Sequence, residues 1–328
     1  MNQSRSLYAL GTAFAALMIA AALLFGVVRM ILASEVPTTD TQYLYIERGS
    51  GLLRASYLAD RQGLVKARWH FLVAAKMLGM ERSLQAGEYE IAPSFTLRET
   101  FEKIRRGERF LRRLAVPEGL STREIDALLR SSFGLELEGL RLAPEGSLLP
   151  DTYFYERGDK ASTLLARMQG KQRELVDSIW AARAPGLPFE SVEEAITLAS
   201  IVEKETGVAS ERPMVAAVFV NRLKKGMRLQ SDPTVIYGIT EGLPLGRAIT
   251  RSDLKEVTAY NTYRIAGLPP TPIANPGEQA IRAVLNPADV PYLYFVADGS
   301  GGHAFAVSLD EHNRNVARWR QYERNSRP

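Results

Sequence analysis

An uncharged apolar run near the amino terminus constrains this chain most. It extends from Ser6 to Val28, and its 23 residues exceed the roughly 20 that a helix needs to cross a bilayer. The apolar core of a cleaved signal sequence is shorter, at about 7–15 residues. We therefore predict a single transmembrane helix within residues 6–33, preceded by a cytoplasmic terminus at residues 1–5. The polar residues 34–41 are expected to form a linker.

The orientation and the processing of this helix are open from the sequence. Arg5 on one flank favours a cytoplasmic amino terminus by the positive-inside rule, whereas Arg29 lies on the other flank. The alanine-rich run and the small residues up to Ser34 also fit a signal sequence that is cleaved. The whole chain has 46% hydrophobic and 24% charged residues, which is typical of a folded protein. We expect the body of the protein to lie on one side of the membrane.

The segment after the linker has the periodicity of a small mixed module. Two strand-like runs enclose two helical patterns, at residues 43–47, 52–63, 67–80 and 87–92 in chain order. We therefore predict a first folded domain with a strand–helix–helix–strand core at residues 42–115.

The rest of the chain, residues 116–328, alternates helical patterns with irregular segments. Residues 161–183 form one long helical pattern, and a capping-box motif at Ser191 opens another that runs toward Thr206. Residues 229–276 have the composition of loops, and residues 292–308 that of a β-hairpin around a glycine-rich turn. The predicted fold class is α+β: one transmembrane helix, a βααβ module, and then a mixed α/β domain.

The composition excludes several kinds of chemistry. The chain has no cysteine, which rules out disulfides, thiolate nucleophiles and cysteine-based zinc sites. Its three histidines lack the spacing of a zinc-binding helix, so we predict no metal site. The formal charge of +4 is spread along the chain, so we expect no nucleic-acid partner. A Ser-His-Asp site stays open, although Ser300 and His303 beside the hairpin turn are more typical of structural positions.

The helix expected to end near Thr206 carries two carboxylates in its last turn. At about 100° per residue, the apolar residues Leu198, Ile201 and Val202 lie on the same side as Glu205. Glu203 points about 160° away from Glu205. A carboxyl at the end of an apolar stripe is partly desolvated, which raises its pKa, and a general acid for glycosidic cleavage needs that property. The alternative is that both glutamates lie on a frayed, solvated turn.

Two later segments combine the side chains that suit a carbohydrate site. Residues 228–237 and 259–263 mix carboxylate, amide, hydroxyl and aromatic groups, which can cover sugar faces and bind hydroxyl and N-acetyl groups. Either segment alone would also fit ordinary turns with core tyrosines. The candidate substrate-binding residues are Gln230, Asp232, Thr234, Tyr237, Tyr260, Asn261 and Tyr263.

The motifs around these residues resemble one family over nearly the whole chain after the apolar run. The chain resembles the YceG-like family of endolytic murein transglycosylases at LASIVEKET (Leu198–Thr206), VFVNRLKKGMRLQSDPTVIYG (Val218–Gly238), AYNTYRIAGLPPTPIANPG (Ala259–Gly277) and YLYFVADGSGGHAF (Tyr292–Phe305). Two upstream segments match as well, LQAGEYEI (Leu84–Ile91) and VPEGLS (Val116–Ser121). Residues 239–258 form a shorter loop than many members of the family have, which leaves the motifs intact.

This resemblance implies a single-pass protein of the bacterial inner membrane, with a LysM-like module before a periplasmic catalytic domain. It implies lytic cleavage of the MurNAc–GlcNAc bond in nascent glycan strands, giving 1,6-anhydro ends without metal or cofactor. Lytic transglycosylases commonly place the catalytic glutamate directly before serine or threonine, which favours Glu205 over Glu203. Glu203 would then support the site from the helix end. Stabilisation of the oxocarbenium could fall to Asp232 or to the substrate's own N-acetyl group.

The resemblance also implies partners, namely peptidoglycan glycan strands, the inner membrane, and peptidoglycan synthases of the penicillin-binding protein class. Two other interpretations stay open. The chain could be a non-catalytic scaffold that binds peptidoglycan at the membrane, or a hydrolase that uses water and leaves a reducing end. The intact EKET segment (Glu203–Thr206) and both polar–aromatic segments favour an enzyme over a scaffold.

Overall fold

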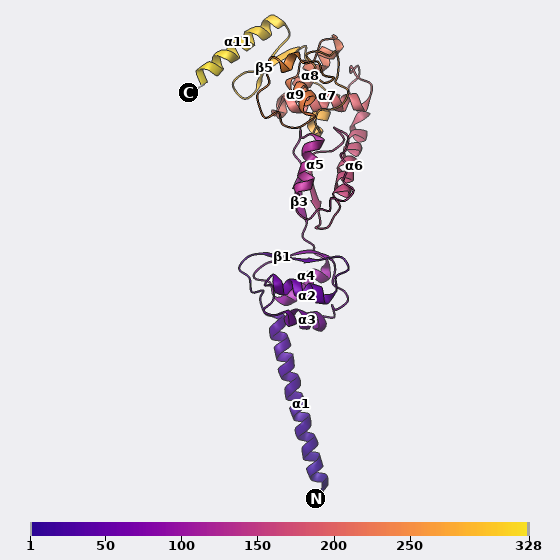
Figure 1. The fold of residues 1–328 in the computed structure, drawn as a ribbon, viewed down its shortest axis with the longest axis vertical. Helices are drawn as coiled ribbons and strands as arrows, with labels where there is room; N and C mark the ends of the chain where they lie inside the picture. The colour runs from indigo at the N-terminus through magenta and orange to yellow at the C-terminus, as the bar shows by residue number, and fades with distance from the viewer. Residues whose placement is uncertain (1, 327–328) are drawn as a thin grey trace. The chain divides into compact units, whose positions relative to one another are not determined.

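A computed structural model describes residues 2–326 of the chain. The chain forms two units, one of Met1–Arg112 with Tyr155–Arg157, the other of Arg113–Phe154 with Gly158–Pro328. Figure 1 traces it from helix α1 (Asn2–Leu32) to helix α11 (Leu309–Ser326). Met1 of the expected cytoplasmic terminus, residues 1–5, lies outside the described residues, as do residues 327 and 328 of the expected domain at 116–328.

Helix α1 contains the apolar run. Its segment Leu10–Leu32, 23 residues long, is long and apolar enough to cross a membrane. Large side chains along it, such as Leu17 and Leu24, are exposed, which suits lipid better than a protein core. Toward its carboxyl end, Val28 and Ile31 are instead buried in the core of the first unit. The described chain therefore begins with an apolar helix compatible with a single membrane span.

The first unit has the strand–helix–helix–strand order that the sequence predicted. Strands β1 and β2 pair antiparallel, with Leu44 opposite Tyr89, and both of these side chains are fully buried. Phe71 and Phe101, from two helices, meet in the core with their ring centroids 4.6 Å apart. The elements are β1 (Gln42–Ile46), α2 (Leu52–Arg61), α3 (Arg68–Met77), β2 (Gly87–Ile91) and α4 (Leu97–Arg106).

The segment between α1 and β1, expected to be a linker, is attached to the first unit. The N–H of Val36 donates to the carbonyl of Phe95 at 2.8 Å, and the N–H of Leu97 donates to the carbonyl of Ser34 at 3.0 Å. Val36 is also buried in the core. Helix α1 therefore continues into the first unit without a free spacer.

The second unit is mainly helical, with short two-stranded sheets. Strand β3 pairs with β4, and β5 pairs antiparallel with β6 in the predicted hairpin, where Tyr294 lies opposite Ala306. Short 3-10 turns η1 (Ala209–Glu211) and η2 (Asp253–Lys255) connect longer elements. Besides α11, the helices and strands of this unit are β3 (Arg112–Ala115), α5 (Thr122–Ser131), β4 (Thr152–Tyr155), α6 (Ala161–Trp180), α7 (Val192–Glu205), α8 (Arg212–Lys224), α9 (Asp232–Thr240), α10 (Glu278–Leu285), β5 (Tyr294–Ala297) and β6 (His303–Ala306). The end residues Arg112 of β3 and Tyr155 of β4 belong to the first unit.

Helix α7 forms the centre of the second unit and packs against α8, α9 and α10. The predicted capping box is present: the hydroxyl of Ser191 accepts the N–H of Glu194 at 3.1 Å, and the carboxylate of Glu194 accepts the N–H of Ser191 at 3.2 Å. Leu198, Ile201 and Val202 are fully buried. Their burial confirms the apolar stripe predicted along this helix.

Helix α9 corrects the prediction that residues 229–276 are loops. It begins at Asp232 and has Pro233 in its first turn. Proline suits that position, because its missing N–H has no partner in the first turn of a helix and its fixed φ is already helical. The aspartate–proline pair is therefore a helix start here, although turns use the same residues.

Candidate active site

A cleft of about 490 Å³ lies where the end of α7 meets α8, β5 and the loop before α9. Four of the residues selected from the sequence line it, namely Glu205, Gln230, Asp232 and Tyr263. The other residues that line the cleft are Phe219, Arg222, Leu229, Phe295, Val296 and His312. The cleft thus combines acidic, amide, cationic and aromatic groups around one end of a helix.

Glu205 is the last residue of α7, and its Oε1 accepts a hydrogen bond from the hydroxyl of Ser231. Burial, with a smaller contribution from the negative charge of Asp232, raises the pKa of Glu205 to about 6, against the opposing effect of the Ser231 bond. The carboxyl end of a helix also disfavours a nearby negative charge. At pH 7 roughly a tenth of such carboxyls still hold a proton, so Glu205 can act as a general acid.

Ser231 is held in place by two threonines. Its N–H donates to the Thr262 hydroxyl at 2.9 Å, and its carbonyl accepts the Thr234 hydroxyl at 2.6 Å. The two threonine hydroxyls lie 2.8 Å apart. Thr234, which we expected to bind substrate, is fully buried and supports Ser231 instead. The sequence analysis missed Ser231, because a serine in a loop carries no periodic signal.

Asp232 faces the cleft from the first turn of α9. Its Oδ1 accepts a hydrogen bond from the hydroxyl of Tyr263 at 2.7 Å. Burial raises the pKa of Tyr263, so its hydroxyl stays protonated and can donate. The amino terminus of a helix suits a negative charge. The cleft therefore holds a second carboxylate beside Glu205, in surroundings that differ from those of Glu205.

Arg222 of α8 fixes the loop that carries Gln230. Its guanidinium donates to the carbonyls of Leu293 at 2.7 Å and Leu229 at 2.8 Å, and to the Gln230 side-chain oxygen at 3.4 Å. Gln230 has a φ of 53°, in the left-handed region that residues with a Cβ adopt rarely. The buried cation thus holds a strained residue at the edge of the cleft. From sequence, Arg222 was not distinguishable from the exposed lysines that follow it.

Glu203 lies in a different environment from Glu205. Its carboxylate accepts the N–H of Gly277 at 2.9 Å and lies 3.6 Å from the guanidinium of Arg212. The side chain is only 6% exposed, and burial raises its pKa. The alternative of a frayed, solvated turn therefore does not hold for Glu203. It joins α7 to the starts of α8 and α10, while Glu205 lines the cleft.

Asn261 and Tyr260, also expected to bind substrate, are not among the residues that line this cleft. Asn261 is fully buried, and its side-chain amide donates to the carbonyl of Glu256 at 2.6 Å. The hydroxyl of Tyr260 shares a hydrogen bond with Thr271 at 2.7 Å. Its ring packs on that of Tyr237, with centroids 4.8 Å apart. These residues stabilise the loops around the cleft.

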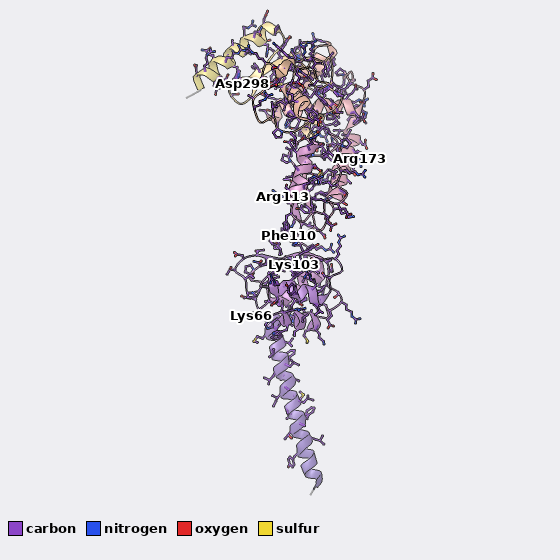
Figure 2. The ribbon with its side chains drawn as sticks, viewed as in Figure 1. Lys66, Lys103, Phe110, Arg113, Arg173 and Asp298 are labelled. Carbon is purple, nitrogen blue, oxygen red and sulfur yellow. The ribbon has the colours of Figure 1, made fainter. Side chains whose placement is uncertain are left out.

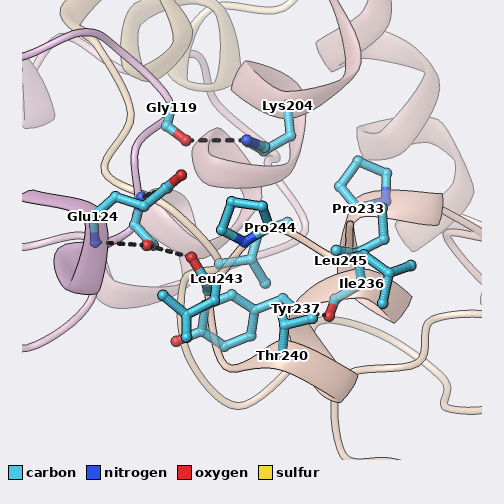
Figure 3. A pocket seen from close by; sticks show the side chains of 13 residues that line it. Gly119, Glu124, Lys204, Pro233, Ile236, Tyr237, Thr240, Leu243, Pro244 and Leu245 are labelled. Carbon is cyan, nitrogen blue, oxygen red and sulfur yellow. Dashed lines mark hydrogen bonds between the residues drawn. The ribbon is translucent and has the colours of Figure 1, made fainter. Parts of the chain in front are cut away.

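Tyr237 lines a second pocket, of about 400 Å³, on the flank of α9. Figure 3 shows Tyr237 there with Pro233 from the same helix, and Lys204 of α7 donating to the carbonyl of Gly119. The Tyr237 hydroxyl donates to Glu145 at 3.2 Å, and burial raises the pKa of that carboxyl. Tyr237 is thus part of a polar network next to the cleft.

His303 and Ser300, which left a Ser-His-Asp site open, each bind another residue. The ring Nδ1 of His303 lies 2.6 Å from the Glu211 carboxylate, which also accepts the His303 N–H at 3.0 Å. The Ser300 hydroxyl donates to Asp298 at 2.8 Å. The neighbouring His303 ring lowers the pKa of Glu205, against the larger effect of burial. His303 therefore contributes to the electrostatics of the Glu205 cleft.

Comparison with known proteins gives relatives named endolytic murein transglycosylases. One, from Bacillus subtilis, is 37% identical over 170 residues, which cover 52% of this chain and 46% of the relative. Another, from Streptococcus pneumoniae, is 26% identical over 319 residues, covering 83% and 57%. The chain spans about half the length of these relatives.

Structural comparison and a family model extend the similarity to the fold. A crystal structure of a yceG-like protein from Listeria monocytogenes matches with a TM-score of 0.52 and 27% identity, over 84% of this chain and 99% of that one. The model of the YceG-like family matches residues 44–318, which include part of the first unit, most of the second unit and every residue selected for the site. On this match, the chain belongs to the YceG-like family.

Proposed function

We propose that this protein is a lytic transglycosylase that cleaves the MurNAc–GlcNAc bond in nascent peptidoglycan strands. Glu205 carries the proposal, because its pKa of about 6 and its place in a polar, aromatic-lined cleft suit a general acid acting on a sugar. The names of the relatives support peptidoglycan as the substrate. One carboxyl that acts first as acid and then as base also fits a reaction that does not activate water.

In this reaction, protonated Glu205 donates its proton to the glycosidic oxygen, and the bond between that oxygen and C1 of MurNAc breaks. The resulting Glu205 carboxylate then takes the proton of the MurNAc C6 hydroxyl, while the oxygen of that hydroxyl attacks C1. The new C1–O6 bond gives a 1,6-anhydro end and restores protonated Glu205. No water is consumed, and one carboxyl serves first as acid and then as base.

The other groups in the cleft would bind and orient the sugar. Ser231 fixes the direction of the Glu205 carboxyl through its hydrogen bond. Asp232, which accepts a hydrogen bond from the Tyr263 hydroxyl, provides a negative charge that would stabilise the positive charge at C1. The substrate's own N-acetyl group is the alternative. Gln230 and Arg222 provide an amide and a cation for polar groups of the strand.

The rest of the chain fits an enzyme anchored at the inner membrane. We propose that α1 spans this membrane with the remainder in the periplasm, that residues 42–115 form a LysM-like, glycan-binding module, and that residues 116–328 form the catalytic domain. The apolar length of α1 and the βααβ order support this division. Peptidoglycan synthases of the penicillin-binding protein class would then work beside it on the same strands.

Product analysis by mass spectrometry tests the reaction. The full chain should be used in detergent, because the end of α1 is part of the core of the first unit. We expect anhydromuramyl ends from peptide-bearing peptidoglycan, their loss in Glu205→Gln, and their retention in Glu203→Gln. Reducing ends would instead indicate a hydrolase. Binding of strands without cleavage by the unmodified protein would indicate a scaffold.

A further inference from the structure

Helix α3 is apolar on two faces. Its inner face is buried in the core of the first unit and consists of Phe71, Ala74 and Ala75. Its outer face carries Trp69, Leu72, Val73 and Met77, a spacing that aligns side chains along one side of a helix. Trp69 is 51% exposed and Met77 is 55% exposed. Lys76 lies on the same side of the helix and is also exposed. Exposed apolar side chains that gather on one face mark a site of contact with a protein or a membrane, so the outer face needs a cover that the first unit does not supply.

The outer face adjoins the part of α1 that suits a membrane. Helices α1 and α3 contact each other, and an open groove of about 410 Å³ lies between them. The groove is lined by Ala21, Leu24, Phe25, Val28, Val73, Lys76 and Met77. In Figure 1, α3 lies at the end of the first unit from which α1 extends. The apolar surface of α1 therefore continues onto the outer face of α3.

The length of α1 sets the height of this groove in a bilayer. The 23 residues of Leu10–Leu32 extend about 34 Å, against roughly 30 Å for the hydrocarbon core. Val28, Ile31 and Leu32 belong to this span and are already buried in the first unit. Since Val36 is tied to the same unit by hydrogen bonding, no spacer lifts the unit off the membrane. Helix α3 must then lie at the level of the headgroups and the outer acyl chains.

The charges near α3 complement an anionic lipid surface. Between Arg61 and Met80 the sequence has four basic residues and no aspartate or glutamate. Lys66 and Lys76 are exposed, and Figure 2 labels Lys66 at the end of the first unit where α1 emerges. Tryptophan and lysine favour the membrane interface, and lysine is attracted to anionic headgroups. Both the apolar and the charged side chains therefore suit contact with an anionic lipid bilayer.

We propose that α3 is an interfacial helix, embedded in the anionic phospholipid leaflet from which the carboxyl end of α1 emerges. The outer face lies among the acyl chains, and Lys66 and Lys76 lie at the headgroups. This inference rests on the proposed membrane span and not on the proposed reaction. It makes the first unit a module held against the bilayer, not one that moves on a tether.

Depth-dependent quenching of tryptophan fluorescence tests this arrangement in the full chain. The chain has three tryptophans, so the variant with Trp180→Phe and Trp319→Phe reports on Trp69 alone. The control carries Phe110→Trp in a background without the three native tryptophans. Figure 2 labels Phe110 at the end of the first unit opposite Lys66. Both proteins are placed in phosphatidylcholine–phosphatidylglycerol vesicles with or without bromine on the acyl chains.

We expect bromine to lower Trp69 emission roughly twofold, and to leave the Phe110→Trp control almost unchanged, as an interfacial helix requires. When Lys66→Glu and Lys76→Glu are added to the protein that reports on Trp69, quenching should fall, and it should fall more as the phosphatidylglycerol fraction increases. The control pair Lys224→Glu and Lys225→Glu should leave the quenching of Trp69 unchanged. If the protein resists extraction by alkaline carbonate but the two tryptophan positions are quenched equally, the membrane span stands and the interfacial position of α3 is wrong. Extraction of the protein by carbonate would overturn the membrane span and the inference together, without bearing on the reaction.

Discussion

The hydroxyl of Ser231 donates a hydrogen bond to Oε1 of Glu205 and so links the loop before α9 to the last residue of α7. Because this bond favours the charged carboxylate, it lowers the pKa of Glu205 against the larger effect of burial. Ser231 therefore orients the carboxyl and also limits how far its pKa rises. Such a balance suits a group that first gives a proton and then takes one back.

The pH dependence of cleavage should follow the protonation of Glu205. Burial raises the pKa of this carboxyl to about 6, so the acid form dominates below that pH and declines above it. Since the first step needs the acid form, we expect kcat/KM to fall about tenfold per pH unit well above the pKa. Initial rates on purified glycan strands across this range would show it. A rate that does not change through pH 6 would contradict the assignment of Glu205 as the acid.

Two substitutions should move this pH profile in opposite directions. Ser231→Ala removes a bond that lowers the pKa of Glu205, so the alkaline limb should move to higher pH. Asp232→Asn removes a negative charge that raises the same pKa, so the limb should move to lower pH. Each variant serves as the control for the other, because both change a polar group in the same loop. If both variants moved the pH profile in the same direction, the conformation of the loop, and not its polar groups, would determine the pKa of Glu205.

Substitutions of Glu203 and Glu205 should have different effects, one on the stability of the fold and the other on cleavage. Glu203→Gln weakens a buried contact with Arg212 and Gly277, so we expect the free energy of unfolding to fall by about 1–3 kcal/mol. Cleavage by the folded fraction should persist. Glu205→Gln should abolish cleavage without loss of stability, since burial disfavours the charged form that it replaces. Denaturant unfolding and product analysis on both variants would measure this, and the reverse pattern would exchange the two roles.

The parts of the fold that the sequence predicted are those set by local periodicity. The stripe Leu198, Ile201 and Val202 and the cap at Ser191 depend on neighbours within a few residues, and both are present. Helix α9 was missed because its start, Asp232 with Pro233, is also a common turn pair. The deciding contacts for this segment come from Thr262, far along the chain.

The same distinction explains which site residues the sequence predicted. Glu205 could be selected because its own helix determines where it points. Thr234 and Asn261 have side chains suited to sugars, yet both are fully buried, and their burial depends on how distant loops pack. Arg222 was missed because its main acceptor, the carbonyl of Leu293, lies 71 residues away. Side-chain chemistry alone does not distinguish a residue that binds a ligand from one that supports a loop.

Gln230 offers a test of how the loop presents its side chains to the cleft. Gln230 and Glu241 both have a φ of 53°, so glycine relieves a similar backbone strain at either position. Because glycine also makes the unfolded chain more flexible, we expect the free energy of unfolding to change by no more than about 1 kcal/mol in each variant. Gln230→Gly additionally removes a side chain from the cleft and its contact with Arg222.

The KM for glycan strands should therefore rise roughly fivefold in Gln230→Gly, the equivalent of one hydrogen bond, while kcat changes less. Glu241→Gly should leave KM unchanged, because its lost ion pair with Arg123 is exposed and contributes little. Steady-state kinetics on strands of defined length would compare the two. An equal rise of KM in both variants would show that the rigidity of the segment around α9 matters, and would remove Gln230 from the residues proposed to bind substrate.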